Sequence, residues 1–204
     1  MIKGYYFITD SFLSRAGIIS DVSLAVKCGV GFVQYREKTA STKVLFEEAT
    51  ELRKICGSAK LIINDRIDIA LAVSADGVHI GQEDMPLARA RRLLGKDKII
   101  GVTVHNEPEA REAEKLGADY LGISPVFETG TKKDAGAACG TELIRKIRSF
   151  SKLPLTAIGG INFDNVSEVI SSGADSICAI SAVASSSDPA EAIRRLQYLF
   201  ASES

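Results

Sequence analysis

The feature that most constrains the fold of this chain is a short apolar run that recurs along it and ends each time in polar residues or glycine. Clear examples are Phe32–Val33 before Gln34 to Lys38, Leu61–Ile63 before Asn64 to Arg66, Ile99–Val102 before Thr103 to Asn106, and Leu155–Ile158 before Gly159–Gly160. Short continuous apolar runs are typical of strands that are buried on both faces. The chain therefore predicts a set of short buried strands, each with a polar or glycine tip.

A second motif recurs just before several of these runs, in Cys28–Val33, Ser74–His79, Leu116–Leu121 and Ser172–Ile177. It reads as a helix end, a tight turn of small residues and entry into a strand. Strands that alternate with helices through such short connections pair in parallel. We expect strands at Tyr5–Thr9, Phe32–Tyr35, Leu61–Asn64, Gly77–Ile80, Ile99–Val104, Tyr120–Ile123, Leu155–Ile158 and Ser176–Ile180.

Helical patterns with one apolar face lie between these strands. Some begin with a capping signal, an Asn or Asp followed by Glu three residues later. The clearest cases are the face of Leu45, Ala49, Leu52 and Cys56, the start at Asn106 with Glu109, and a last helix after Asp188 with a stripe of Ile193, Leu196 and Phe200.

About eight strand–helix units in 204 residues predict a (β/α)8 TIM barrel, as a single domain over residues 1–204, although such barrels typically run to ~250 residues. The alternative is a doubly wound open sheet. That fold favours a glycine-rich turn after its first strand, and Thr9-Asp10-Ser11 supplies none. In a barrel the carboxyl ends of all strands meet at one mouth, where active sites lie, so the polar tips should converge there.

Composition narrows the classes of function. The formal net charge of −1 gives no global field that would attract nucleic acid or an acidic membrane. The chain also lacks the run of about 18 apolar residues that a spanning helix requires. Four separated cysteines, without a Cys-x-x-Cys pair, fit small buried side chains in a reducing cytoplasm. We expect a cytoplasmic enzyme without a nucleic acid or membrane partner. Its oligomeric state stays open, a homo-oligomer included.

Two carboxylates at neighbouring tips suggest a metal site. Asp65 follows the third expected strand and Asp84 follows the fourth. Mg²⁺ is commonly bound by one or two carboxylates together with phosphate oxygens and water, so the pair predicts Mg²⁺ at the mouth. The alternative is that both aspartates cap the helices that follow them.

Three basic residues near the tips, Arg36, Lys38 and Lys132, suit a diphosphate that is bound with a metal. Arginine can bond two oxygens at once, and lysine adds a point charge. The alternative is a solvated rim, since lysine and arginine are usually exposed. In that case Glu37 pairs with one of its basic neighbours.

The last two tips differ from the others. Gly159–Gly160 and Ile180–Ser181 expose backbone N–H groups where barrels often hold a phosphate. For the glycines the alternative is a tight turn with positive φ. The two histidines, His79 and His105, have no partner that the sequence reveals, so a structural role is favoured for both.

The residues alone indicate a Mg²⁺-assisted enzyme that acts on phosphorylated small molecules. Taken in order, the tips resemble those of the thiamine-phosphate synthase family, from Tyr5 to about Ile193. The resemblance depends on the number, order and spacing of these segments: Gln34–Lys38, Asn64–Asp68, Asp76–Pro86, Pro125–Phe127, Thr131–Lys132, Ala157–Ile161 and Ile180–Ser181.

The resemblance implies a (β/α)8 transferase that joins a pyrimidine diphosphate to a thiazole phosphate with Mg²⁺, by a dissociative substitution. It places Gln34, Tyr35, Arg36, Glu37, Lys38, Asn64, Thr103 and Lys132 at the pyrimidine diphosphate, with Arg36, Lys38 and Lys132 as catalytic residues. It places Thr129, Gly130, Thr131, Gly160, Ile180 and Ser181 at the thiazole phosphate, and Asp65 and Asp84 at Mg²⁺. Thr103 stands where the family usually has serine, and Glu128 stands where proline is common.

Two other functions compete with this prediction. A related thiazole tautomerase of the same family acts on the thiazole phosphate alone and needs neither the diphosphate site nor the metal. A non-enzymatic sensor of phosphorylated ligands could keep Gly160 and Ser181 but has no use for paired carboxylates. The presence of Lys38, Asp65, Asp84 and Lys132 together favours the synthase.

Overall fold

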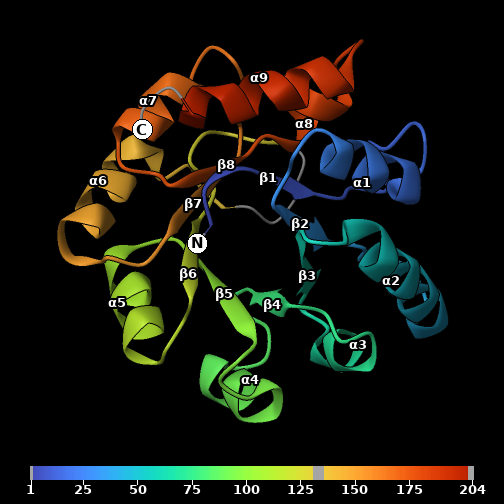
Figure 1. Cartoon of the computed structure of the whole chain (residues 1–204). Helices are drawn as coiled ribbons and strands as arrows, with labels where there is room; N and C mark the ends of the chain where they lie inside the picture. The colour runs from blue at the N-terminus through green and yellow to red at the C-terminus, as the bar shows by residue number, and fades with distance from the viewer. Residues whose placement is uncertain (1, 131–135, 202–204) are drawn as a thin grey trace.

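The computed structural model describes residues 2–130 and 136–201, and within them the chain forms a closed barrel of eight parallel strands with helices around it (Figure 1). Each strand pairs with the next in chain order, and β1 pairs with β8 through Gly4 opposite Ser176 and Tyr5 opposite Ile177. This last pairing closes the sheet. The prediction of a (β/α)8 barrel is therefore confirmed, and the open sheet is excluded.

The strands lie close to the predicted positions. They are β1 (Gly4–Ile8), β2 (Phe32–Tyr35), β3 (Lys60–Asn64), β4 (Gly77–Ile80), β5 (Ile99–Val104), β6 (Tyr120–Ile123), β7 (Leu155–Ile158) and β8 (Ser176–Cys178). β1 and β3 differ from the predicted Tyr5–Thr9 and Leu61–Asn64 by one residue at one end or both, and the largest error is at the end of β8. The last strand ends at Cys178 rather than Ile180, because Ile180 already begins a helix whose first turn is closed by a hydrogen bond from Val183 N to Ala179 O.

The helices follow the strands in strict alternation until the end of the chain. They are α1 (Ile18–Lys27), α2 (Thr42–Cys56), α3 (Ile67–Ala72), α4 (Leu87–Leu94), α5 (Glu107–Lys115), α6 (Gly140–Phe150), α7 (Val166–Ser171), α8 (Ile180–Ala184) and α9 (Pro189–Ala201). The short α8 comes in addition to the repeating unit, at the place where barrels often add a helix beside a phosphate site.

The core has two layers, one outside the barrel and one inside it. Outside, the predicted apolar face of α2 is fully buried against the strands, as is the predicted stripe of α9. Inside, Tyr6, Ile62, Tyr120 and Cys178 fill the barrel interior. Alternating residues of each strand therefore serve different layers, since successive side chains point to opposite faces.

The recurring turn motif forms a repeated structure at the amino ends of the strands. Its aspartates, Asp76, Asp119 and Asp175, accept hydrogen bonds from the backbone N–H groups of Leu61 (2.9 Å), Ile100 (2.7 Å) and Leu155 (2.8 Å) in the preceding strand. Each aspartate also pairs with an arginine of the helix that leads into that preceding strand, Arg53 of α2, Arg91 of α4 or Arg148 of α6. We call these three Arg–Asp pairs the base latches. They hold β3 to β4, β5 to β6 and β7 to β8 at the end of the barrel opposite the mouth.

The fourth strand pair, β1 and β2, uses a different side chain at the same level. Gln197 of α9 accepts a hydrogen bond from Tyr5 N (2.9 Å) and donates one to Gly29 O (2.9 Å). Figure 1 shows α9 lying across β8 and β1, beside α1. The C-terminal helix therefore supplies the contact that the recurring motif supplies elsewhere.

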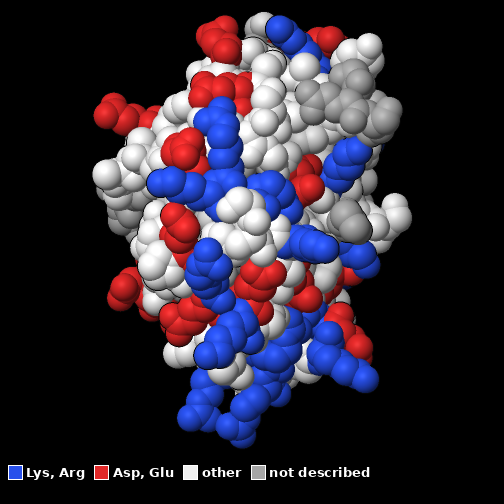
Figure 2. Space-filling view, turned by 90° about the vertical axis from the view of Figure 1, so that its left-hand side faces the viewer, with Lys and Arg blue, Asp and Glu red and all other residues white. Residues whose placement is uncertain are grey.

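The surface carries both signs of charge. Figure 2 shows Lys and Arg interspersed with Asp and Glu on one face, with basic side chains gathered at the end where α4 lies. That helix alone contributes Arg89, Arg91 and Arg92. No helix among the described residues is long and apolar enough to cross a membrane.

Candidate active site

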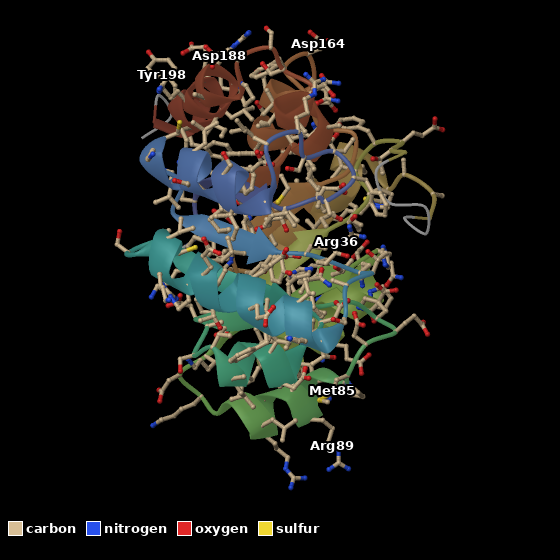
Figure 3. All side chains as sticks on the ribbon, turned by 90° about the vertical axis from the view of Figure 1, so that its right-hand side faces the viewer. Arg36, Met85, Arg89, Asp164, Asp188 and Tyr198 are labelled. Carbon is tan, nitrogen blue, oxygen red and sulfur yellow. The ribbon has the colours of Figure 1, made fainter. Side chains whose placement is uncertain are left out.

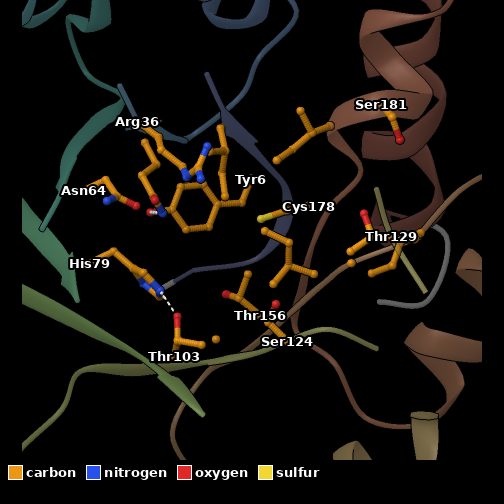
Figure 4. A pocket seen from close by; sticks show the side chains of 18 of the residues that line it. Tyr6, Arg36, Asn64, His79, Thr103, Ser124, Thr129, Thr156, Cys178 and Ser181 are labelled. Atoms are coloured by element: carbon orange, nitrogen blue, oxygen red, sulfur yellow. Dashed lines mark hydrogen bonds between the residues drawn. The ribbon is translucent and has the colours of Figure 1, made fainter. Parts of the chain in front are cut away.

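A cavity opens at the carboxyl ends of the strands, where the polar tips were predicted to meet. Eight of the predicted site residues line it, namely Gln34, Arg36, Asn64, Thr103, Thr129, Gly160, Ile180 and Ser181. Figure 4 shows Arg36, Asn64 and His79 on one side of this cavity and Thr129 and Ser181 on the other. The structure thus brings the predicted tips together, and it separates them into two ends of one space.

The first end is built around Arg36. Its side chain lies 3.8 Å from the Asp10 carboxylate, and its backbone N–H and C=O both bond the Thr9 hydroxyl, at 2.8 and 3.0 Å. Figure 3 shows Arg36 close to the barrel, whereas Asp188 and Tyr198 lie at the outer edge. Sequence reasoning missed Thr9 and Asp10 as supports of this cation. The signal was available, because they form the tip of the first strand.

Two other predicted residues of the second tip have different surroundings. Tyr35 alternates with Gln34 and Arg36 and therefore points out of the barrel, where its hydroxyl donates a hydrogen bond to Glu48 of α2 (2.5 Å). Glu37 accepts hydrogen bonds from Thr39 N (2.6 Å) and Ala40 N (3.1 Å). Burial opposes ionisation of Glu37, but these bonds and one from Ser11 lower its pKa to about 2. Neither side chain lines the cavity.

The two predicted metal ligands lie next to each other at the rim. Asp65 contacts both Lys38 and Asp84, and Asp84 accepts a hydrogen bond from Gly81 N (2.8 Å). Burial raises the pKa of the Asp65 carboxyl, and Asp84 adds to that rise while Lys38 opposes it. Within the described residues no group of three or more His, Cys, Asp or Glu side chains could hold a metal. Two adjacent carboxylates without further protein ligands are the donor set that suits Mg²⁺ bound through phosphate oxygens and water.

The second end of the cavity is made by two glycines at which any side chain would be strained. Gly159 and Gly160 both have positive φ, 102° and 63°, and a Cβ on Gly159 would lie 2.6 Å from Pro125 Cβ. The close approach allows Val126 N and Phe127 N to bond the β7 tip, at 2.9 and 3.0 Å. A second cavity adjoins this end and is lined by Gly130 as well as by Thr129, Gly160 and Ser181. Thr131 and Lys132 lie outside the described residues.

The floor of the cavity holds polar side chains that sequence reasoning did not assign. Tyr6, His79 and Tyr120 line it and hydrogen-bond to one another, to Gln34 and to Thr103. The partners of His79 come from strands far apart in the sequence, so spacing alone could not reveal them. A weaker signal existed in Gly101 and Gly122, whose missing side chains leave space inside the barrel.

The barrel and the site at its mouth define a (β/α)8-barrel enzyme, and comparison with known proteins places it more closely. The family model described as thiamine monophosphate synthase matches residues 5–183. The thiamine-phosphate synthase of Methanosarcina barkeri is 58% identical over 185 residues, which are 90% of this chain and 84% of that protein. The thiamine-phosphate synthase of Syntrophomonas wolfei is 49% identical over 200 residues, 96% of this chain and 95% of that protein.

A solved structure agrees with these sequence relatives. The thiamine phosphate pyrophosphorylase from Pyrococcus furiosus superposes with a TM-score of 0.90 at 41% identity, covering 98% of this chain and 96% of that one. The chain belongs to the thiamine monophosphate synthase family, and it is a transferase.

Proposed function

We propose that this chain joins 4-amino-5-hydroxymethyl-2-methylpyrimidine diphosphate to 4-methyl-5-(2-hydroxyethyl)thiazole phosphate, giving thiamine phosphate and pyrophosphate. The observation that carries the proposal is the cavity with two different ends, one with Arg36 and the other with Gly160 and Ser181. Two phosphorylated substrates need two anion sites that face a common centre. The names of the relatives, at up to 58% identity, support the same reaction.

The end with Arg36 suits the diphosphate. Arg36 can bond two oxygens at once, and Lys38 at the neighbouring rim adds positive charge beside Asp65. Asp65 and Asp84 would hold Mg²⁺, which stabilises negative charge on the departing pyrophosphate when it is bound. Lys132 extends this group in our proposal, on the strength of the family resemblance alone.

The end with Gly160 suits the single phosphate of the thiazole. Its lining combines Thr129 and Ser181 hydroxyls with glycine backbone, and it has no basic side chain among the described residues that line either cavity there. A phosphate in such a site is bound by N–H and O–H donors instead of by opposite charge. This difference would keep the diphosphate and the monophosphate at separate ends.

The reaction that fits this arrangement is dissociative. The bond between the pyrimidine methylene carbon and the diphosphate oxygen breaks first, and its electron pair leaves with pyrophosphate. The aminopyrimidine ring stabilises the resulting cation, and the lone pair of the thiazole nitrogen then forms the new carbon–nitrogen bond. Arg36 and Lys38 stabilise the growing negative charge, which is the largest demand on the site because no proton transfer begins the reaction.

The test mixes the purified chain with both precursors, with Mg²⁺ or with a chelator, and follows thiamine phosphate by its oxidation to fluorescent thiochrome. We expect product only when both precursors and Mg²⁺ are present. Isomerisation of the thiazole without any thiamine phosphate would instead identify a tautomerase and refute the proposal.

The metal ligands are tested with Asp65→Asn and Asp84→Asn. Asparagine is the suitable replacement at position 65, because Asp65 has φ of 58° and asparagine tolerates that conformation better than alanine. Calorimetric titration of Mg²⁺ in the presence of pyrophosphate should show weaker binding for both variants. Asp97→Asn, an exposed aspartate before β5, is the matched control and should bind as the wild type does. Equal Mg²⁺ affinity in all four proteins would show that Asp65 and Asp84 are structural.

A further inference from the structure

Five polar side chains form one continuous hydrogen-bonded chain across the barrel interior. Gln34 Nε2 donates to the Tyr6 hydroxyl (3.2 Å), which lies 3.0 Å from the Tyr120 hydroxyl. The Tyr120 hydroxyl lies 2.8 Å from His79 Nδ1, and His79 Nε2 lies 2.8 Å from Thr103 Oγ1. Figure 4 marks this last bond with a dashed line at the cavity. The chain begins at a buried amide and ends at the substrate cavity.

Three of the five members of this hydrogen-bonded chain are too buried for water to replace their partners freely, whereas His79 and Thr103 are partly exposed at the cavity. Gln34, Tyr6 and Tyr120 are 2%, 1% and 0% exposed. Burial raises the pKa of both tyrosines, so both hydroxyls keep their protons. A buried hydroxyl proton needs an acceptor, and this requirement gives the chain a direction.

The direction is set at the Gln34 end, because an amide nitrogen only donates. Tyr6 accepts from Gln34, so its own proton must point to Tyr120. Tyr120 then donates to His79 Nδ1, which must be the unprotonated ring nitrogen. The proton of the neutral imidazole therefore sits on Nε2, which donates to Thr103. The reverse order would turn the Tyr6 proton toward a nitrogen that cannot accept it.

Two glycines leave the space inside the barrel that this hydrogen-bonded network occupies. A Cβ on Gly122 would lie 2.8 Å from His79 Cε1, and a Cβ on Gly101 would overlap the Tyr120 ring. Both glycines have ordinary extended backbone rather than positive φ, so turn geometry does not explain them. Their role is the space that the two rings occupy.

We propose that this hydrogen-bonded network holds His79 as the Nε2–H tautomer. It thereby directs the Thr103 hydroxyl proton into the cavity, where the hydroxyl acts as a hydrogen-bond donor to the ligand. His79 and Tyr120 are positioning residues, and Thr103 is the residue that touches the substrate. The inference rests on the proposed function for the identity of that substrate. It adds the chemical class that Thr103 recognises, an acceptor such as an unprotonated ring nitrogen of the pyrimidine.

The first test observes the tautomer directly and needs no substrate. The chain has only two histidines, so ¹⁵N-labelled imidazole resonances are simple to assign with a His105→Asn variant. His105 Nδ1 lies 2.5 Å from the Ser124 carbonyl oxygen, an acceptor, so His105 must carry its proton on Nδ1. At a pH where both rings are neutral, we expect His79 to be protonated on Nε2 and His105 on Nδ1. His79 protonated on Nδ1 would overturn the proposal.

The second test breaks the chain and measures the substrate. Tyr120→Phe removes the donor to Nδ1, so the His79 Nδ1 resonance should move toward the value of a nitrogen without a hydrogen bond. KM for the pyrimidine diphosphate should rise by about tenfold, the equivalent of one lost hydrogen bond, with KM for the thiazole phosphate unchanged. Tyr5→Phe is the matched control, because Tyr5 is an equally buried tyrosine of β1 that packs outside the barrel, and it should change neither quantity.

The third test concerns Thr103 itself. Thr103→Val keeps the shape and removes the donor, so KM for the pyrimidine diphosphate should again rise about tenfold, whereas Thr103→Ser should stay near wild type. A pyridine analogue that lacks the ring nitrogen should bind the wild type and Thr103→Val equally weakly. An unchanged KM in Thr103→Val would refute the donor role. Failure of the proposed function would appear separately, as absence of thiamine phosphate with the predicted tautomer still present.

Discussion

The space left by Gly122 leads to a sharp prediction about stability. Gly122→Ala places a methyl group 2.8 Å from His79 Cε1, whereas carbon atoms in contact prefer about 3.5–4.0 Å. The imidazole must therefore retreat by roughly 0.7 Å. Its two hydrogen bonds, to Tyr120 and Thr103, are 2.8 Å long, and such a retreat would stretch them to about the limit for a hydrogen bond.

The cost can be worked out from these contacts. Overpacking a buried site typically costs about 1–3 kcal/mol, and each weakened hydrogen bond adds up to about 1 kcal/mol. We expect Gly122→Ala to lose about 2–4 kcal/mol of a total stability of roughly 5–15 kcal/mol. For a chain of this size the melting temperature should fall by roughly 4–16 °C, since each kcal/mol shifts it by about 2–4 °C. Backbone propensity alone predicts that Gly122→Ala raises the free energy of unfolding, because alanine restricts the unfolded chain more than glycine does.

Urea unfolding followed by circular dichroism measures the effect, with Gly31→Ala as the control. Gly31 has no atom within 4 Å of its missing side chain and lacks positive φ, so its alanine variant should be as stable as the wild type or slightly more stable. A double-mutant cycle with His79→Ala identifies the cause. Once the imidazole is gone, Gly122→Ala should cost far less than it does alone. Equal costs in both backgrounds, or a Gly122→Ala variant as stable as the wild type, would refute the reasoning.

Three shorter predictions follow from other contacts. Asp10→Asn keeps the acceptor for Phe12 N and removes the charge beside Arg36, so KM for the pyrimidine diphosphate should rise about threefold to tenfold in initial-rate assays, and an unchanged KM would show that Arg36 needs no such support. The pKa of Asp76 is lowered, since bonds from Lys60, Leu61 N and Arg53 outweigh the effect of burial. The stabilisation by the Asp76 carboxylate is present above pH about 4 and is lost as pH falls through the folded pKa. Asp76→Asn should therefore be less stable than the wild type at pH 7, and this difference in unfolding free energy should narrow in acid. Asn106→Ala removes the cap on Glu109 N (2.9 Å) and should cost about 1 kcal/mol by urea unfolding, with activity at saturating substrate unchanged.

Much of the fold could be predicted from the sequence, because the strands of a barrel are buried on both sides and can be recognised as apolar runs. Phe32–Tyr35, Gly77–Ile80 and Tyr120–Ile123 were located to the residue. The end of β8 was predicted wrongly, because Ile180 is as apolar as the strand before it and only the tertiary fold shows that α8 begins there.

The candidate site was predictable in part for a related physical reason. Tips that follow strands directly, such as Arg36 and Asn64, reach one mouth in any closed barrel. The floor network was not predictable, because its contacts join residues 24 to 114 positions apart, as in His79 with Thr103 and Tyr6 with Tyr120. Because successive side chains of a strand point to opposite faces, not every residue at a strand end reaches the cavity. Tyr35 lies between two residues that line the cavity and yet faces α2.

The contacts at the base of the barrel set an order in which the chain can complete its fold. The base latches join residues 23, 28 and 27 positions apart, so each can form as soon as its own strand pair has been synthesised. Gln197 and Tyr5 are 192 positions apart, and closing so long a loop carries the largest entropic cost of the four. The contact of β1, the first strand to be synthesised, with Gln197 can therefore form only after the last helix has been synthesised. Until β8 pairs with it and α9 adds Gln197, β1 offers an unpaired edge, and a nascent or truncated chain would be most exposed to misassociation there.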